Sequence, residues 1–319
     1  MIETAFPKRS ADPLTRGHEP APGYEVISHL SRGRRLDVYD AWSHERSTRC
    51  VLKTLRPERL NDAEARAKLV REGRLLQRLS HPHIVRGYET ITTPEPIVVM
   101  ETLGGETLGH MIEAQAPLAA NEVAHLGLHL ASAIAYLHRH GHLHLDVKPD
   151  NVVAEASRAK LIDLSLARPP GEAAPGIGTW CYLAPEQARG GALGAPADVW
   201  GIGVTLFEAA SGKPAFDDDG GESWSTGPQT DGRPSWETGG DQSDPWDGDY
   251  PQLDGPAPAL ASVSSQPPGL CALIDACLAR GAGDRPTVAE LLARLELVAA
   301  VPEGERHHQP RKRAFPDGD

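Results

Sequence analysis

The heptapeptide Leu-Asp-Val-Lys-Pro-Asp-Asn at residues 145–151 constrains the fold of this chain more than any other stretch. It brings a carboxylate (Asp146), an amine (Lys148) and a carboxamide (Asn151) together directly behind a long apolar-striped segment, 121–140, which is predicted to be a helix. An Asp and an Asn five residues apart on a loop can share a metal-bound phosphate, because the Asp orients an attacking hydroxyl while the carboxamide oxygen holds Mg²⁺. A polar surface loop after a helix is the alternative, but it would not require matched motifs on both sides.

Short alternating or β-branched runs separated by turns lie mostly in the first third of the chain and predict antiparallel strands. They are residues 24–27, 37–42, 49–53 and 96–101. Apolar residues at helical spacing predict an exposed amphipathic helix over 62–79 and further helices over 121–140, 196–210, 267–278 and 288–298. Segments 152–153 and 160–162 predict a short hairpin after the loop. Strands first and helices afterwards indicate an α+β chain with segregated lobes.

Length, charge and cysteine content limit the class of protein. The 319 residues are enough for two lobes around substantial cores. The formal charge of −12 argues against nucleic acid as the main partner. Four cysteines without CxxC spacing favour a reduced cytosolic protein, and no apolar run approaches the ~18 residues of a membrane span. We therefore expect a cytoplasmic chain without a membrane anchor.

Residues 217–249 differ sharply in composition from the rest of the chain. They are rich in Asp, Gly, Ser, Thr and Pro, with Arg233 as the only base, and predict an acidic disordered insert. The pentapeptide Ser-Trp-Ser-Thr-Gly at 223–227 recurs twelve residues later as Ser-Trp-Glu-Thr-Gly. Low-complexity drift and a docking motif for a partner both explain this echo. An N-terminal arm, 1–22, and a C-terminal tail, 300–319, are also predicted to be flexible.

Three further motifs follow the loop in order. They are Gly-Thr-Trp-Cys-Tyr-Leu-Ala-Pro-Glu at 178–186, Asp-Val-Trp-Gly-Ile-Gly at 198–203 and Asp-Arg-Pro-Thr at 284–287. With these motifs the chain resembles the eukaryotic-type (Hanks-type) bacterial serine/threonine protein kinases over roughly 24–297. The resemblance implies a bilobal kinase domain over 23–299, with a small antiparallel β N-lobe bearing one helix (23–102) and a larger, mainly helical C-lobe (103–299). Small-molecule kinases of related fold would lack the Ala-Pro-Glu and Asp-x-Trp landmarks.

On the nucleotide side, the resemblance implies contacts with ATP from the N-lobe and the hinge. Glu72 would pair with Lys53 and fix its ammonium against the α- and β-phosphates. Met100 would be the gatekeeper, and the backbone groups of Glu101 and Leu103 would meet adenine.

On the catalytic side, the resemblance assigns roles to the groups of the loop. Asp146 would orient the acceptor hydroxyl and finally accept its proton, and Lys148 would steady the γ-phosphate. Asn151 and Asp163 would hold Mg²⁺, since Asp163 falls where the family has Asp-Phe-Gly. Ser165 replaces the glycine of that motif, which should stiffen the backbone there.

The phosphate-covering loop departs from the family pattern Gly-x-Gly-x-x-Gly-x-Val. Residues 31–38 read Ser-Arg-Gly-Arg-Arg-Leu-Asp-Val, so Ser31, Gly33 and Val38 are the expected nucleotide contacts and a single glycine remains. Arg34 and Arg35 either replace backbone contacts with charge or are solvated loop residues.

Both halves of the usual activation-loop switch are missing. Leu145 occupies the position where many protein kinases have a phosphate-binding Arg. No Ser, Thr or Tyr lies between Leu166 and Gly178. We therefore expect activity that is independent of activation-loop phosphorylation. Thr179 is expected to shape the substrate-binding loop near Asp146 and Lys148.

Histidines are dense around the loop, and His125 and His129 even stand at i, i+4. Without an evident third ligand, a metal site built from imidazoles is disfavoured. Arg285, in the last motif, is suited to a buried structural pair with Glu186.

Two hypotheses for function follow. The leading one is a serine/threonine protein kinase that transfers the γ-phosphoryl group of Mg-ATP to Ser or Thr hydroxyls of protein substrates. The alternative is a pseudokinase that serves as a nucleotide-binding or protein-binding scaffold, supported by the eroded glycine loop, Ser165 and Leu145. The presence of all the charged residues of the kinase pattern favours the enzyme.

Overall fold

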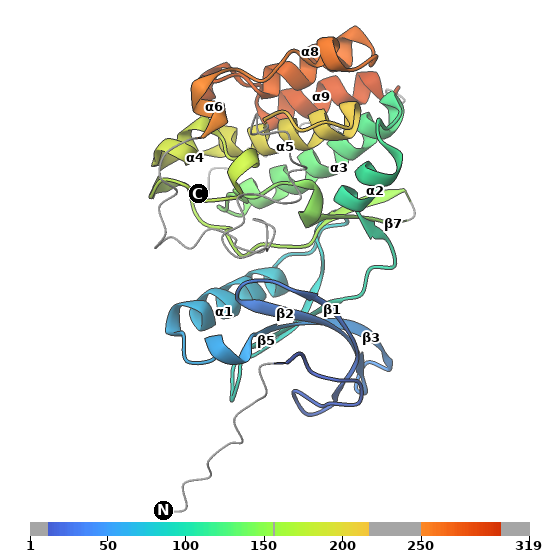
Figure 1. Cartoon of the computed structure of the whole chain (residues 1–319), viewed down its shortest axis with the longest axis vertical. Coiled ribbons are helices and arrows are strands. Elements are labelled where there is room, and N and C mark those ends of the chain that lie inside the picture. The colour runs from blue at the N-terminus through green and yellow to red at the C-terminus, as the bar shows by residue number, and fades with distance from the viewer. Residues whose placement is uncertain (1–11, 156, 217–249, 301–319) are drawn as a thin grey trace, which may run out of the picture.

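The computed structural model describes residues 12–155, 157–216 and 250–300. Over these ranges the chain forms two lobes, a small one built on a sheet and a larger one built of helices (Figure 1). The α+β architecture with segregated lobes that the sequence predicts is therefore confirmed. The predictions of a disordered insert over 217–249 and of flexibility in residues 1–11 and 301–319 lie outside the described residues.

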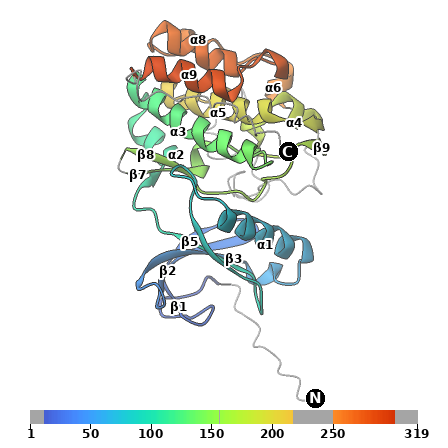
Figure 2. The same ribbon diagram turned by 180° about the vertical axis from the view of Figure 1, so that it is seen from behind.

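The N-lobe is a five-stranded antiparallel sheet with strand order β1-β2-β3-β5-β4. Its strands are β1 (Tyr24–Arg32), β2 (Leu36–Ser43), β3 (Thr48–Leu55), β4 (Gly87–Ile91) and β5 (Ile97–Glu101). Helix α1 (Ala63–Arg78) lies across this sheet (Figure 2) and starts at Asp62, whose side chain accepts a hydrogen bond from the Ala65 amide. The buried residues of α1, which recur every three to four positions, face the sheet and are Ala65, Leu69, Glu72, Gly73 and Leu76.

Residues 12–23 belong to the N-lobe, which corrects part of the flexible arm predicted for 1–22. The Leu14 amide donates to the hydroxyl of buried Tyr39 at 3.0 Å, and Val26 exchanges backbone hydrogen bonds with Gly17 and His18. The side chains of Leu14 and Ala21 are buried against the outer face of the sheet. These contacts offset the entropy of ordering a polar, proline-containing segment.

The C-lobe is built around α5 (Ala195–Ser211), which is buried along almost its whole length. Apart from a few buried polar residues, Asp198 and Glu208 among them, this helix is apolar on all sides, as expected for an element enclosed by others. It packs against α3 (Ala120–Arg139) and α8 (Pro268–Cys277), and α9 (Val288–Val298) packs against α3. The remaining helices are α2 (Leu108–Gln115), α4 (Pro185–Arg189), α6 (Pro251–Asp254) and α7 (Leu260–Val263).

Two small sheets complete the C-lobe near its junction with the N-lobe. One contains β6 (Glu106–Thr107), β7 (Val152–Glu155) and β8 (Arg158–Leu161), and the other pairs β9 (Gly171–Ala173) with β10 (Gly191–Leu193). The β7–β8 hairpin is the one that the sequence predicts after the loop. The segment between α1 and β4 lies along β8, because the amide of Val85 donates to Leu161 O at 2.8 Å and the amide of Leu161 donates to His83 O at 3.0 Å. The lobes are thus joined by backbone hydrogen bonds behind the site.

Candidate active site

The three charged residues that the sequence predicts around ATP come together between the lobes. Lys53 on β3 is buried, and its Nζ lies 2.6 Å from Glu72 Oε1 on α1 and 3.1 Å from Asp163 Oδ2 of the C-lobe. Burial alone would lower the pKa of Lys53, but the carboxylates of Asp163 and Glu72 outweigh it and raise that pKa. Burial would likewise raise the pKa of Asp163, yet the Lys53 ammonium and hydrogen bonds from Ser165 hold it well below its usual range. Lysine and aspartate are therefore both charged at neutral pH.

A buried carboxylate of α5 fixes the loop that follows α3. Asp198 accepts hydrogen bonds from the backbone amides of His144 at 2.9 Å and Leu145 at 2.7 Å. His138, in the last turn of α3, contacts the same carboxylate at 2.7 Å. Asp198 thus ties the last turn of α3 and the first residues of the loop to α5.

Leu145 holds a left-handed backbone conformation with φ +66°, which costs a branched residue about 1 kcal/mol or more. Its side chain is buried, its amide donates to Asp198, and its carbonyl oxygen accepts a hydrogen bond from Gln187 Nε2 at 2.9 Å. The same Gln187 nitrogen donates to Ile177 O at 2.7 Å. An uncharged amide thus ties residues 145–151, the predicted catalytic loop, to residues 166–178, the predicted activation segment, at the place where the sequence lacks an Arg.

The catalytic loop carries a connected set of polar side chains. Thr179 Oγ1 donates to Asp146 Oδ1 at 2.7 Å and accepts from Lys148 Nζ at 2.9 Å. Asn151 Nδ2 donates to both Asp146 O and Asp146 Oδ2 at 2.9 Å. The structure therefore brings the predicted residues Asp146, Lys148 and Asn151 together, with Thr179 between them as expected.

Asn151 and Asp163 lie on neighbouring segments and supply oxygen atoms of the type that Mg²⁺ prefers. The Ile162 amide donates to Asn151 O at 3.0 Å, which sets the next residue, Asp163, beside the catalytic loop. Because Asn151 donates through Nδ2 to Asp146, its Oδ1 points away from that carboxylate and forms no hydrogen bond with any described residue. A carboxylate and a carboxamide oxygen so placed fit a magnesium ion.

The residues after Asp163 attach it to α1. The Ser165 amide donates to Asp163 Oδ1 at 2.7 Å, and the Leu164 amide lies 3.4 Å from Glu72 Oε1. Leu164 is buried in the same cluster as Leu69 and Leu76 of α1. The two amides thus fix the Asp163 carboxylate and link the residues after it to Glu72 of α1.

The phosphate-covering loop is a tight hairpin between β1 and β2. Gly33 N donates to Leu36 O at 2.8 Å across its turn. Just before the turn, Arg32 Nε and Nη2 form two parallel bonds, of 2.7 and 3.0 Å, to the carboxylate of buried Asp37. Sequence reasoning missed this pair. An Arg and an Asp five residues apart across a short turn were the available signal.

The two other residues predicted in this loop lie opposite each other on its strands. Ser31 on β1 pairs with Val38 on β2, and Val38 in turn pairs with Lys53 on β3. The loop is thus in register with the strand that carries Lys53, which is what a site for phosphates requires.

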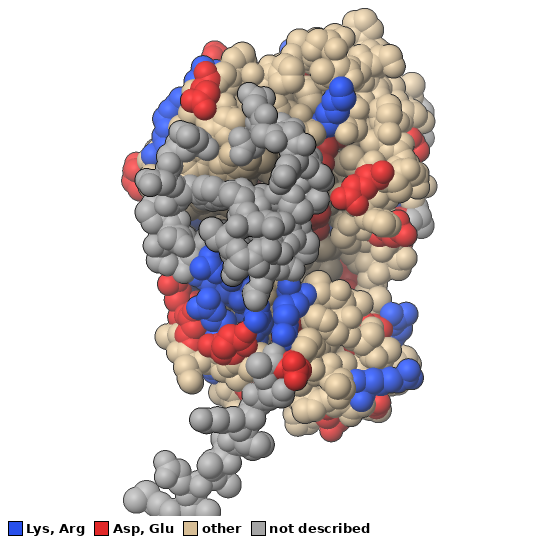
Figure 3. Space-filling model, in the orientation of Figure 1, with Lys and Arg blue, Asp and Glu red and all other residues tan. Residues whose placement is uncertain are grey.

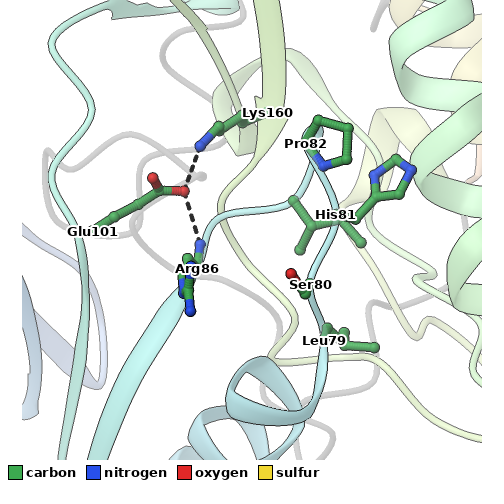
Figure 4. A pocket seen from close by; sticks show the side chains of 8 residues that line it. Leu79, Ser80, His81, Pro82, Arg86, Glu101 and Lys160 are labelled. Carbon is green, nitrogen blue, oxygen red and sulfur yellow. Dashed lines mark hydrogen bonds and ion pairs between the residues drawn. The ribbon is translucent and has the colours of Figure 1, made fainter.

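The hinge strand β5 carries an ion pair on its rear side. Lys160 Nζ on β8 lies 2.5 Å from Glu101 Oε1, which also accepts a hydrogen bond from the Arg86 amide at 2.9 Å (Figure 4). These groups line a pocket of about 250 Å³ with residues of the α1–β4 connection, among them His81 and Pro82. The Glu101 side chain therefore joins the lobes, while Met100 before it is buried in the core as a gatekeeper would be.

The structural pair predicted for the C-lobe is present. Arg285 forms two bonds to the Glu186 carboxylate, of 2.6 and 2.8 Å, and its guanidinium lies 4.9 Å from the centre of the Trp200 ring. It also donates to Pro196 O at 2.9 Å. The segment that ends in Ala-Pro-Glu is thus fastened to α5 and to the residues before α9.

The histidines do not converge. His125 Nδ1 contacts Asn121 O, whereas His129 Nδ1 accepts from the Ala159 amide. Within the ranges that the structure describes, no three or more His, Cys, Asp or Glu residues are grouped so as to hold a metal ion. None of the described helices has the length and apolar character that crossing a membrane requires.

A sheet lobe with one helix, a helical lobe and a Lys–Glu–Asp triad between them define the class of protein kinases. In agreement, the family model of the protein kinase domain matches residues 24–295, and the chain belongs to this family.

The chain is similar to curated bacterial proteins over part of its length. A probable serine/threonine-protein kinase PknB of Lactococcus lactis is 35% identical over 208 residues, which are 62% of this chain and 33% of that protein. PknB of Mycobacterium tuberculosis is 32% identical over 209 residues, 61% of this chain and 33% of that protein. A probable serine/threonine-protein kinase of Streptomyces coelicolor is 32% identical over 206 residues, 60% of this chain and 31% of that protein. The matched regions thus span about a third of the length of these relatives.

Proposed function

We propose that the chain is a serine/threonine protein kinase that transfers the γ-phosphoryl group of Mg-ATP to hydroxyls of protein substrates. The observation that carries the proposal is the position of Lys53, whose buried ammonium lies between the carboxylates of Glu72 and Asp163. A fixed, fully charged amine beside a carboxylate that can bind a cation is what recognition of a nucleotide polyphosphate requires. The names of the bacterial relatives support the choice of Ser and Thr as acceptors.

In this proposal, the nucleotide is held by groups of both lobes. Lys53 binds the α- and β-phosphates, and Ser31, Gly33 and Val38 cover them from the hairpin. The Glu101 and Leu103 backbone groups meet adenine. Asp163 and Asn151 Oδ1 hold Mg²⁺, which when bound neutralises charge on the transferring phosphate.

The acceptor hydroxyl would be positioned by the polar set of the catalytic loop. Asp146 is held by Thr179 and Asn151 through separate oxygen atoms, so its carboxylate is fixed before a substrate arrives. Lys148 Nζ lies on the far side of Thr179 and would steady the γ-phosphate. Such preorganisation supplies catalysis through position and charge rather than through covalent chemistry.

The tether through Gln187 supports activity without phosphorylation of the activation loop. Leu145 carries no charge for a phosphate to bind, and no Ser, Thr or Tyr lies between Leu166 and Gly178. The hydrogen bonds from Gln187 to Leu145 O and Ile177 O hold this segment against the catalytic loop instead. Incubation with ATP followed by phosphosite mapping tests this: an activity-controlling phosphate on Thr179 or Tyr182 would exclude it.

The activity is tested by transfer of radiolabelled phosphate from Mg-ATP to a generic basic protein. We expect Lys53→Met and Asp146→Asn to reduce transfer by more than about 100-fold, since each removes a group that acts on the reacting phosphate or hydroxyl. Lys213→Met, at an exposed position after α5, is the matched control and should retain activity. Equal incorporation by wild type and Asp146→Asn would exclude the kinase hypothesis and leave the pseudokinase hypothesis. No contact described above favours the pseudokinase. The cytoplasmic location stays a prediction.

A further inference from the structure

A pocket lies on the outer side of α1, away from the active site. Its volume is about 340 Å³, within the range of small-ligand sites, and it lies between α1 and the segment that connects β4 to β5. Its walls combine an apolar floor with three guanidinium groups; the lining residues are Arg66, Ala67, Val70, Arg71, Arg74, Thr92 and Pro96. Four of them, at 67, 70, 71 and 74, recur at the spacing of one helix face. We call these residues the α1 groove.

Two charges of the α1 groove have no partner among the described residues. Arg71 and Arg74 are exposed and form no ion pair or hydrogen bond there, whereas Arg66 donates to the carbonyl oxygens of Leu60 and Pro94. Lys and Arg side chains gather over the end of the N-lobe that carries α1 (Figure 3). No other described helix or strand lies over the outer side of α1, which packs on β3, β4 and β5 with its opposite side. The α1 groove is thus a cationic, partly apolar surface on a protein with net charge −12.

The chain itself contains a segment of complementary chemistry. Residues 217–249 hold eight Asp and two Glu against one Arg, and they include three of the six Trp residues of the protein. An indole ring fills an apolar pocket at small entropic cost and stacks well on guanidinium groups, while neighbouring carboxylates form charge-assisted bonds with Arg. Acidic residues around a Trp therefore match an apolar floor rimmed by arginines.

The three Trp residues differ in how far they can reach from the described chain. Trp246 and Trp224 lie four residues from Tyr250 and eight residues from Phe216, the ends of the described chain on either side. At ~3.5 Å per residue, they reach only about 14 and 28 Å from those ends. Trp236 lies fourteen residues from Tyr250 and reaches up to about 50 Å, and it is followed by Glu237. Among the three, it has the longest reach from the C-lobe to α1.

We propose that the α1 groove binds the acidic segment 217–249 of the same chain, with Trp236 on the floor formed by Ala67, Val70 and Pro96 and with Glu237 and nearby carboxylates on Arg71 and Arg74. The recurring Ser-Trp-x-Thr-Gly sequence then belongs to a docking element. This binding site is independent of the phosphoryl-transfer chemistry and holds whether or not the chain is an active kinase.

The direct test measures binding of a fluorescein-labelled peptide of residues 217–249 by anisotropy. The receptor is the full-length chain in which 217–249 is replaced by a neutral Gly/Ser segment of equal length, so that its α1 groove has no internal occupant. We expect saturable binding that weakens as salt is raised, and at least a tenfold rise in Kd for Arg71→Glu combined with Arg74→Glu. Arg78→Glu is the matched control, since Arg78 is exposed on the same helix but does not line the α1 groove. Its Kd should stay within about twofold.

Two further arms decide whether the occupant comes from the same chain. Wild-type protein should bind the added peptide at least fivefold more weakly than the Gly/Ser receptor, and Trp236→Ala should relieve this competition. Equal binding by wild type and the Gly/Ser receptor would overturn the proposal, as would affinity that the double Arg reversal leaves unchanged. A dimer in sedimentation that dissociates on Trp236→Ala would assign the contact to two copies and would also overturn it. Unchanged thermal unfolding of the Arg variants shows that any loss of binding is not a loss of fold.

Discussion

The catalytic loop and the phosphate-covering hairpin are both loops of the proposed site, but they are held in different ways. The catalytic loop is fixed by Asp198, a buried carboxylate that reaches it from α5 in the centre of the C-lobe. The hairpin is held by the local pair Arg32–Asp37, five residues apart on its own two strands. The loop that carries the charged groups of the proposed chemistry thus depends on the core of its lobe. The hairpin, with its single glycine, is held within the N-lobe by this pair and by Arg56, which donates to Gly33 O at 3.3 Å.

The largest effect is expected from Asp198→Ala, which removes the buried carboxylate that anchors the catalytic loop to α5. This change leaves the amides of His144 and Leu145 buried without an acceptor, so we expect a loss of about 3 kcal/mol in unfolding free energy. Phosphoryl transfer should fall by more than about 100-fold, because Asp146 follows these residues directly. Denaturant unfolding and the radiolabel assay measure the two effects. Asp254→Ala, on the exposed side of α6, is the control, and activity of Asp198→Ala within threefold of wild type would contradict the comparison.

The second prediction concerns Arg32→Ala, which removes the Arg32–Asp37 pair of the hairpin. Asp37 would keep only His29 as a partner, so unfolding free energy should fall by about 2 kcal/mol and the KM for ATP should rise by about tenfold. Arg49→Ala is a control on the neighbouring strands, because Arg49 also forms two bonds with a buried carboxylate, that of Asp40. Since Arg49 is more exposed than Arg32, this variant should lower stability less, and it should leave the KM for ATP unchanged. Equal KM values for both variants would show that the hairpin pair does not position the loop.

The third prediction concerns the joint between the two lobes, where His129 of α3 stacks on His83 at 4.1 Å. Burial, with the nearby positive groups of His83, His125 and Arg158, lowers the pKa of His129 to about 4. The unfolded chain therefore binds more protons than the folded one between pH 6.5 and 4, so stability falls as pH falls through this window. We expect His129→Gln to reduce the loss of unfolding free energy between pH 7 and 5 by roughly 2 kcal/mol.

Denaturant unfolding at the two pH values measures this change. His44→Gln, at an exposed site of the N-lobe, should keep the wild-type dependence on pH. An identical dependence in the His129 variant would mean that its imidazole is not kept neutral by the fold.

The smallest effect is expected from restoring a family glycine with Ser31→Gly. Ser31 is exposed and lies opposite Val38, one position farther from the turn than the Arg32–Asp37 pair. Because that pair already fixes the hairpin, the KM for ATP should change by less than about threefold. Steady-state kinetics with ATP varied decide the point. A tenfold improvement would show that the missing glycines, rather than the pair, limit nucleotide binding.

The resemblance to a known family predicted the charged residues of the site. Lys53, Glu72, Asp146, Asn151 and Asp163 could be placed because they match positions of that family, and the structure brings them together. Whether these residues perform the predicted chemistry stays a prediction. Long periodic helices such as α1 and α9 were placed within a residue or two because an apolar stripe is visible in the chain.

What the sequence did not predict depends on tertiary contacts. Strand β4 contains a glycine and polar residues and shows no clear alternation, so its place at the sheet edge comes from its neighbours β5 and α1. The segment 12–22 has the composition of a flexible arm, and it is ordered by its hydrogen bonds with Val26 and Tyr39 and by the contacts of Leu14 and Ala21 with the sheet. The pairs Arg32–Asp37 and Glu101–Lys160 join residues whose proximity is set by a turn and by the lobe junction. The spacing of Arg32 and Asp37 gives a weak local signal, whereas Glu101 and Lys160 lie far apart in the sequence.

The Gln187 bridge has a consequence for how such a protein can be controlled. Its two hydrogen bonds, to Leu145 O and Ile177 O, involve no group whose charge a phosphatase could remove. Under the proposed independence from activation-loop phosphorylation, the output of this protein would be governed by how much of it is made, how fast it is degraded and which molecules are brought beside it.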